Sequence, residues 1–383
     1  MKRTLLLTLF TMIICTVNGT AADYFIEDGI CYFPITGQNN SVEVGNQSLV
    51  AGSITSTPYA GKVVVPATVT HEMVTYNVVG VTYNAFFENK NVTSVELPNG
   101  ILSIGQSAFY GCRNLTSVNL PSTLEYIAPF AFAYSGIKSA IIPEGVMTIY
   151  PHVFDSCDAL EAISFPTTLK TIGEYGVFKC TKLSNLIIPS TVTSIGEYAF
   201  SGCTSLKSLD YYAANCGDFT NYTGSAHPFF NCPLEKVVFE STVTHLPAGL
   251  LYPSEGLKEI YSYISSPLTI GEDVFHSVDK PSCKLYVPEN SVDLYKTAEV
   301  WKEFSNILAV SSSGIAEDSE DMISVAGSCG KIVIMGAPEG TEIRIYSING
   351  IIVYTGTACE VPIDKTGLYV VKVGNVVKKI ILR

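Results

Sequence analysis

The chain has 383 residues, of which 47% are hydrophobic and 15% are charged, a balance typical of a folded protein and not of a disordered one. Its formal net charge is −12 at neutral pH, yet the residues from Asp321 onward hold seven basic and five acidic side chains. The negative charge is therefore concentrated before Asp321. Such a surface repels nucleic acid and anionic lipid, which excludes both as expected partners.

The first 22 residues have the layout of a secretory signal peptide. Two basic residues precede an apolar run from Leu5 to Cys15, and small residues lead to a cleavage position after Ala22. We therefore expect a protein that is secreted or displayed on the outer cell surface. Lipidation of Cys15 is disfavoured, because Ile14 stands where a lipid-acceptor signal has a small residue. No later segment has the ~20 uninterrupted apolar residues of a membrane-spanning helix.

Residues 23–80 alternate apolar and polar side chains over short stretches such as Lys62–Pro66 and Val74–Val81. A period of two is the pattern of half-buried strands. The first unit of a repeat array must also cover an otherwise exposed apolar end. We therefore expect residues 23–80 to form a β-rich N-terminal cap.

A unit of 22 to 24 residues repeats from Val81 to about Leu209. One mark is a phenylalanine after a small residue, at Phe86, Phe109, Phe132, Phe154, Phe178 and Phe200. A second mark is a proline that closes a short apolar stretch, at Pro98, Pro121, Pro143, Pro166 and Pro189. A fixed period in this range indicates a solenoid, in which each unit buries its apolar side against its neighbours.

Each unit contains two short extended stretches followed by about one helical turn, which the clearest copy places around Tyr198–Phe200. The predicted fold class is therefore an α/β repeat solenoid. Parallel strands stack ~4.8 Å apart, so the phenylalanines are expected to form a continuous aromatic file inside the array.

Four cysteines occupy the same place in successive units, at Cys112, Cys157, Cys180 and Cys203. Parallel Cβ vectors in a stack rarely allow a disulfide, so we expect a buried file of free thiols. The better candidates for disulfides are Cys216 with Cys232 and Cys329 with Cys359. Spacing alone does not determine which cysteines pair.

The rhythm loosens after Asp210. Residues 211–232 are interpreted as an insertion, since His227–Cys232 repeats the ending of a regular unit in altered form. Residues 283–304 predict a strand and then a helix that holds Trp301, the only tryptophan. A C-terminal cap requires such a replacement of the repeat motif. The solenoid with its cap is therefore expected to span residues 81–308.

A polar linker is expected at residues 309–321, and residues 322–383 are predicted to form a small all-β domain of the Ig-like sandwich type. Asn349-Gly350 lies between two alternating stretches and is a strong hairpin signal. A second pair of stretches, 368–373 and 376–382, meets at Gly374-Asn375.

The sequence shows no catalytic or metal-binding motif. The five histidines are scattered, and there is no GxSxG, HExxH or phosphate-cradling glycine loop. His152 lies near Asp155, and both are interpreted as exposed turn residues. Cys216, His227 and Cys232 lack a compact zinc spacing and a fourth ligand. We therefore expect no catalytic site, no metal and no cofactor.

Strand alternation is expected to place two columns of side chains on the outside of the array. The candidate binding residues in these columns are Glu96, Asn119, Ile141, Asn185, Ile187, Asp210 and Tyr261. A flat, lightly charged face suits flat or extended protein partners, with Ile141, Ile187 and Tyr261 as apolar anchors. The alternative is a plain solvated sheet face, because exposed polar side chains need no function.

The segment LSNLIIPSTVTSIGEYAFSGC (Leu183–Cys203) resembles the unit of the BspA-like leucine-rich repeats of bacterial surface proteins. The resemblance covers about Tyr59–Ile307, with Ser135 in place of a cysteine and with Val153 and Val177 in place of alanines. It implies a leucine-rich-repeat array in a non-enzymatic protein that adheres to extracellular or host-surface proteins. A glycan-binding or structural cell-envelope protein is the alternative.

The end of the chain, Ile343–Arg383, resembles the C-terminal sorting domains of type IX secretion substrates. This resemblance implies export across the outer membrane of a Gram-negative bacterium and attachment at its surface.

Overall fold

The computed structural model describes residues 24–38, 40–46, 59–219, 226–310, 324–328, 331–335, 340–347, 352–357, 360–363, 367–373 and 376–382. The predicted signal peptide and the candidate pair Cys329–Cys359 lie outside these residues, as does most of the predicted linker. The described residues form an N-terminal set of strands, a long array of rungs and two antiparallel sheets near the C-terminus.

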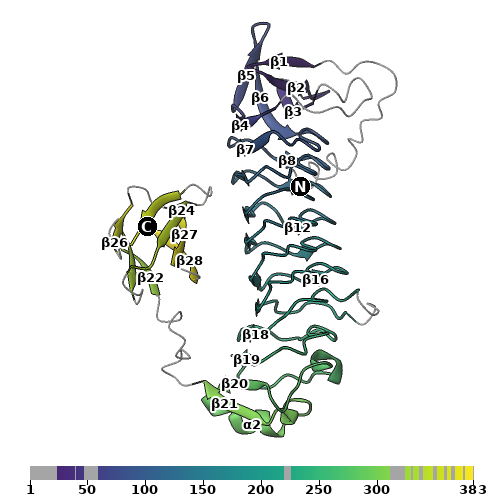
Figure 1. Ribbon diagram of the computed structural model, residues 1–383, viewed down its shortest axis with the longest axis vertical. Coiled ribbons are helices and arrows are strands. Elements are labelled where there is room, and N and C mark those ends of the chain that lie inside the picture. Colours follow the sequence, from purple (N-terminus) through teal and green to yellow (C-terminus); the bar gives the residue numbers. More distant parts are fainter. Residues whose placement is uncertain are drawn as a thin grey trace.

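From Gly61 to Val310 the chain winds through successive rungs, and each rung adds a strand to one long face (Figure 1). The strands of this face are β4 (Gly61–Val64), β7 (Val92–Glu96), β9 (Ser117–Val118), β11 (Ser139–Ile141), β13 (Ala162–Ser164), β15 (Asn185–Ile188), β17 (Ser208–Tyr211), β18 (Lys236–Phe239), β19 (Glu259–Ser262), β20 (Lys284–Pro288) and β21 (Asn306–Val310). Wherever these strands pair with one another, they pair in parallel. The solenoid expected from the repeat is thereby confirmed.

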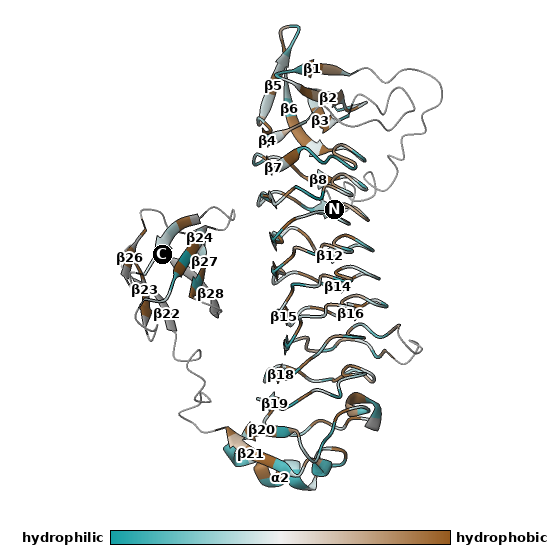
Figure 2. Ribbon diagram, viewed as in Figure 1, coloured by the Kyte–Doolittle hydropathy of each residue, from teal (hydrophilic) through white to brown (hydrophobic). Residues whose placement is uncertain are grey.

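A second column of strands runs beside this face. It contains β6 (Val74–Val81), β8 (Ser103–Ile104), β10 (Tyr126–Ile127), β12 (Thr148–Ile149), β14 (Thr171–Ile172) and β16 (Ser194–Ile195). Hydrophobic and hydrophilic residues alternate along the rungs (Figure 2). The inward residues of both columns join one hydrophobic cluster that extends from Phe25 to Ile307.

The N-terminal strands cover the first rung. β1 (Phe25–Glu27), β2 (Ile30–Pro34) and β3 (Ser41–Gly45) pair in antiparallel order, and β5 (Thr68–His71) forms a hairpin with β6. β3 pairs in parallel with β6, which connects these strands to the second column. Tyr59, which precedes β4, is bonded to both β2 and β3, because its buried hydroxyl donates to Gly45 O and accepts from Cys31 N.

Stacked phenylalanine rings run through the interior of the array. The ring centroids lie 4.9, 5.1 and 5.5 Å apart in the series Phe86, Phe109, Phe132 and Phe154. Farther along, Phe200 stacks on Phe229 with a centroid distance of 5.3 Å. Phe229 therefore takes the place of a file phenylalanine after the insertion, as expected for the segment His227–Cys232.

Phe178 is not part of this file, and its predicted place there is wrong. The main-chain N–H of Val177 donates to Ala199 O, which is the bond that a file phenylalanine makes in other rungs. Val177 is thus the counterpart, and it lies 23 residues after Phe154 and 23 before Phe200. Phe178, one position later, is half-exposed.

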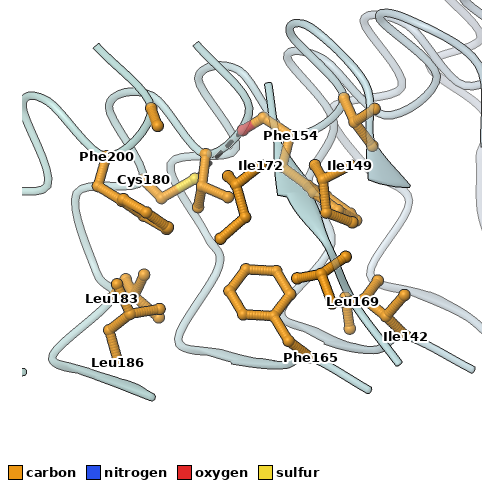
Figure 3. Packing of buried hydrophobic residues seen from close by; sticks show 14 of the residues in the cluster. Ile142, Ile149, Phe154, Phe165, Leu169, Ile172, Cys180, Leu183, Leu186 and Phe200 are labelled. Atoms are coloured by element: carbon orange, nitrogen blue, oxygen red, sulfur yellow. Dashed lines mark hydrogen bonds between the residues drawn. The ribbon is translucent and has the colours of Figure 1, made fainter. Parts of the chain in front are cut away.

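A larger residue in the same rung compensates for the small side chain of Val177. Phe165 stands where other rungs have Leu or Ile before the proline, and it is 5% exposed. Its ring meets that of Phe200 in the next rung edge-on, with centroids 6.4 Å apart (Figure 3). The two changes offset each other in volume, which a packed core tolerates better than either change alone.

The turn after the second strand of each rung is not helical, contrary to the sequence-based expectation. In the rungs from Asn84 to Gly202, two residues four positions apart have positive φ, for example 55° at Tyr198 and 76° at Gly202. Left-handed residues at both ends of so short a segment exclude a helical turn. The array is therefore mostly β and not α/β. The helices whose bounds the structure describes in full lie near its C-terminal end.

The array ends in a cap with η3 (Glu272–Phe275), η4 (Glu289–Ser291) and α2 (Val292–Thr297), after which β21 completes the sheet. Trp301 lies in the separate turn η5 (Trp301–Glu303), because the backbone becomes extended at Ala298 and ends α2. The predicted helix is thus shorter than expected and does not include Trp301. The indole is fully buried, and its N–H donates to Leu268 O at 2.9 Å.

The described strands near the C-terminus form two antiparallel sheets. One contains β22 (Ser324–Ser328), β23 (Lys331–Met335) and β26 (Glu360–Pro362), and the other contains β25 (Ile352–Gly356), β24 (Ile343–Ser347), β27 (Gly367–Val373) and β28 (Val376–Leu382). Ile332 of the first sheet and Ile345 of the second belong to one hydrophobic core. Both predicted hairpin pairings, β24 with β25 and β27 with β28, are confirmed.

Phe109→Ala is expected to lower the free energy of unfolding by roughly 3–5 kcal/mol, because it removes a buried ring and leaves a cavity between two others. Phe178→Ala is the matched control and should cost less than about 1 kcal/mol, since that side chain is half-exposed. Denaturant titration followed by circular dichroism measures both. Equal losses would contradict the assignment of Phe109, and not Phe178, to the file.

Val177→Phe is expected to destabilise the array by about 1–3 kcal/mol, because a second large ring in that rung overpacks the space that Phe165 fills. Adding Phe165→Leu to this variant should recover most of the loss. A double-mutant cycle from the same titrations gives the coupling energy. A coupling energy near zero would show that the side chains at positions 165 and 177 do not compete for the same space in the core.

Candidate functional site

The long strand face presents two outward columns in the register that the sequence predicts. The paired positions are Ser94 with Ser117, Ser139 with Ala162, Ile141 with Ser164, Asn185 with Ser208 and Ile187 with Asp210. One column continues through Lys236, Glu259 and Lys284. The other column continues through Val238, Tyr261 and Tyr286. Side chains at one register position of parallel strands lie on one face, so each column is a row along the surface.

The predicted binding residues differ in how much solvent they meet. The exposed ones are Glu96, Asn185 and Ile187, and Ile187 has 50% of its surface accessible. The half-buried ones are Asn119, Ile141 and Asp210. Tyr261 is only 7% exposed, so its expected role as an exposed apolar anchor is wrong.

The neighbours of Tyr261 in the adjacent rungs cover its ring. On one side Tyr286 stacks on it with a centroid distance of 4.5 Å, and from the other rung Lys236 Nζ lies 4.8 Å from the ring centroid. The hydroxyl donates to Glu259 Oε2 at 3.3 Å. A large ring between large side chains loses solvent contact even at an outward position, and strand alternation alone does not reveal this.

Asn119 has a structural role. Its Oδ1 accepts from Leu97 N at 2.7 Å, and its Nδ2 donates to Leu97 O at 2.7 Å. These bonds join neighbouring rungs just beyond the short strand β9. Because both polar ends of the amide are occupied, Asn119 is a weaker candidate for partner contact than the exposed Asn185.

Three tyrosines near Tyr261 are absent from the sequence-based candidates. Tyr286 continues its column, whereas Tyr212 and Tyr263 directly follow β17 and β19 at the next outward position. The sequence signal is the recurrence of tyrosine in DYY, YSY and LYV around the degenerate strands. Aligning these stretches requires the strand register, because the insertion after Asp210 obscures the period.

A second aromatic row lies on the turns. The rings of Phe130, His152, Tyr175 and Tyr198 stack with successive centroid distances of 4.4, 4.7 and 4.8 Å. All four are half-buried residues with positive φ at equivalent places in successive rungs. Each ring face covers the next, so this row holds the turns together and offers a partner mainly ring edges.

His152 and Asp155 do not form a catalytic arrangement. His152 Nδ1 lies 2.8 Å from Asp155 Oδ2, and Ser156 Oγ donates to Asp155 Oδ1 at 2.8 Å. In a hydrolytic triad the histidine stands between the nucleophile and the acid, whereas here the carboxylate stands between the other two. Asp155 is 7% exposed, so its interpretation as an exposed turn residue is wrong.

The cysteine column joins successive rungs. Each thiol donates to a main-chain carbonyl of the preceding rung, as in Cys112 to Phe86 O at 2.9 Å, Cys157 to Phe132 O at 3.0 Å and Cys180 to Phe154 O at 3.2 Å (Figure 3). All eight cysteines within the described residues are buried and free, which confirms the expected thiol file. The candidate disulfide between Cys216 and Cys232 is therefore wrong.

In the described part of the chain, no three His, Cys, Asp or Glu side chains gather in a way that would hold a metal ion. Helices with the length and hydrophobicity to cross a bilayer are likewise missing from these residues.

Sequence comparison identifies the repeat. The profile of the BspA type leucine rich repeat region matches residues 81–207 and 174–298, with six copies. The chain belongs to this family. No curated protein matches the chain significantly.

Several solved structures match this chain at low sequence identity. A leucine-rich repeat protein from Bacteroides ovatus is 22% identical, with a TM-score of 0.44 over 74% of this chain and 76% of that one. A leucine rich cell surface protein from Faecalibacterium prausnitzii is 20% identical, with a TM-score of 0.41 over 78% and 99% of the two chains. A leucine rich repeat protein from T. pallidum is 23% identical, with a TM-score of 0.35 over 57% of this chain and 86% of that one. The family assignment rests on the profile match.

The thiols of the leucine-rich repeat array are expected to resist Ellman's reagent at pH 8 in the folded protein and to react after denaturation. Burial raises the pKa of Cys112 and of Cys157 to about 12, so the reactive thiolate is scarce. These values exceed the ordinary 9.0, so the free energy of unfolding should fall as the pH rises from 9 toward 12. Mass-spectrometric mapping identifies each modified cysteine. Rapid labelling of Cys112 in the folded chain would contradict this prediction.

Proposed function

We propose that the protein is an exported, non-enzymatic surface protein whose leucine-rich repeat array binds other proteins. The observation that carries this proposal is the outward strand face, whose paired columns keep one register along the array. Such a face offers many side chains to a flat or extended partner over a broad area. Family membership supports it, since leucine-rich repeat arrays generally bind proteins.

The domain organisation in this proposal follows the sequence. Residues 1–22 act as the export signal, 23–80 as the cap, 81–308 as the array with its own C-terminal cap and 309–321 as the linker. Residues 322–383 act as a sandwich domain of the type IX sorting kind. Two sheets around one core support a separate domain at the end of the chain. The protein would then be secreted or held on the outer surface of a Gram-negative bacterium.

The partners in this proposal are extracellular or host-surface proteins, so the array would mediate adhesion. Ile187 is the strongest apolar candidate for contact, because half of its surface is accessible on the outward face. Asn185 lies in the same strand as Ile187, and Glu96 lies four strands away and pairs with Lys62. Both are exposed on the same face and would supply polar contacts along it. A few buried apolar anchors within a polar rim are the usual energetic pattern of a protein interface.

Ile187→Arg is expected to weaken binding of the full chain to its extracellular-matrix partner at least about tenfold, since an interface anchor is replaced by a charge. Immobilised matrix proteins and a glycan array, measured by biolayer interferometry, provide the readout. Met147→Arg is the matched control, because Met147 is 55% exposed and precedes β12 in the other strand column. Equal effects of both variants, or binding to glycans alone, would contradict the proposal.

A further inference from the structure

The middle of the outward face carries no ionisable side chain. We name its residues the neutral strip, and they are the outward residues of four successive rungs together with the proline that follows in each: Ser117, Asn119, Pro121, Ser139, Ile141, Pro143, Ala162, Ser164, Pro166, Asn185, Ile187 and Pro189. The face is charged on both sides of the strip, at the Lys62–Glu96 pair before it and at Asp210 after it. The strip is therefore a distinct part of the face.

The neutral strip exposes apolar area. Ile187 is 50% exposed, and Ile141 is half-buried. The side chains of Ser139, Ala162 and Asn185 are exposed as well, so no element of the described chain covers this side of the sheet. Parallel sheets usually have both faces covered, and here only the inward face is.

The strip is symmetric about β13. This strand pairs in parallel with β11 on one side, and β15 lies beside it on the other. Ile141 and Ile187 occupy the same outward column one rung before and one rung after Ser164. A proline follows at the same place in all three rungs. The two isoleucines are thus equally far from the middle rung, which carries only small side chains.

A two-fold axis along β13 makes this symmetric strip complementary to itself. Rotation by 180° about the strand direction reverses the order of the rungs, keeps each column in place and turns the face toward its copy. Ile141 of one copy then meets Ile187 of the other, and the same contact is made a second time. Ala162 and Ser164 lie on the axis, where small side chains let two aligned sheets approach. Such a self-complementary patch is what a two-fold symmetric dimer requires.

Charge favours a second copy over a charged occupant. A charged side chain placed against Ile141 and Ile187 would lose water without gaining a counter-charge, which is costly for either sign. A second copy presents a strip as neutral as the first. At the rim, the exposed Lys138 and Glu161 precede β11 and β13 and carry opposite charges in each copy. The net charge of −12 on each copy acts from a distance and is screened by salt.

We infer that two copies of this chain form a two-fold symmetric dimer through their neutral strips, with Ile141 of each copy against Ile187 of the other. Four rungs at a spacing of ~4.8 Å make the strip roughly 15–20 Å long, a small contact that gives a reversible dimer. The dimer covers Ile187, which the proposed function also uses. Dimer formation and binding of another protein at this residue therefore compete.

Sedimentation equilibrium of the full chain, without any matrix protein, tests this inference. The parent chain should reach the mass of a dimer at concentrations up to about 100 μM, as expected for a small interface. Ile187→Arg and Ile141→Glu should each raise the dissociation constant at least about tenfold, because each places a charge against an isoleucine of the other copy. A parent chain that stays monomeric over this range would overturn the inference.

The double variant Ile141→Glu/Ile187→Arg tests the two-fold geometry. Each introduced carboxylate then faces an introduced guanidinium of the other copy, so the dissociation constant should fall at least about threefold below that of either single variant. A double variant that dimerises no better than the single ones would show that the two positions do not face each other, and the inference would be overturned. Circular dichroism on each variant confirms that the rungs remain folded.

Met147→Arg is the matched control, since it adds the same positive charge at a 55% exposed residue beside the other strand column. It should change the dissociation constant less than about twofold, because a distant surface charge is screened. A loss equal to that of Ile187→Arg would mean that dimer formation follows net charge alone, which contradicts the inference.

The same measurements separate this inference from the proposed function. If no matrix protein binds, but the dimer responds to the variants as described, the dimer is supported and the proposed adhesion function is not. If a matrix protein binds and Ile187→Arg weakens it, while the parent chain sediments as a monomer, the function stands and the inference is overturned.

Discussion

The structure depends on one constraint: a rung of the array can pair its main chain and bury its apolar side only against the rungs beside it. The file from Phe86 to Phe154 meets this constraint in the core, with rings stacked 4.9 to 5.5 Å apart. The cysteine column meets it at the turns, where thiols donate to carbonyls of the preceding rung. The left-handed turns follow from it as well, because they return each rung to the same register.

The same constraint determines what kind of surface the protein has. Inward side chains are fixed by stacking, so chemical variety is confined to the outward positions and the turns. Residues that approach one another there come from neighbouring rungs and lie side by side on a face. This geometry favours recognition of a partner over a broad area, and it gives little support to enclosing a small substrate.

The repeat, the parallel pairing and the outward register could be predicted from the sequence, because periodicity records them directly. The place of Val177 in the phenylalanine file could not be predicted, because Phe178, one residue later, matches the sequence motif of a file phenylalanine. The uneven intervals around Phe178 were the available sign, for an equal spacing of 23 residues requires Val177. The turns were also mistaken for helix, because small and aromatic residues suit both and only φ separates them. Tyr261 shows a further limit: alternation predicts which way a side chain points, while its exposure depends on the size of its neighbours.

The degenerate rungs separate folding requirements from function. Their inward residues Leu209, Val237, Ile260 and Leu285 are as fully buried as those of the regular rungs. The inward stacking is therefore complete in these rungs. It does not require a tyrosine or a glutamate on the outward side of the same strands. Small or polar residues occupy most of the outward positions of the regular rungs, with Ile141 and Ile187 among the exceptions, and the strands keep their register. The tyrosines and carboxylates of β17 to β20 are therefore not required by the inward stacking, and they contact one another across the outward face instead, as Tyr286 does with Tyr261 and Tyr212 does with Asp210.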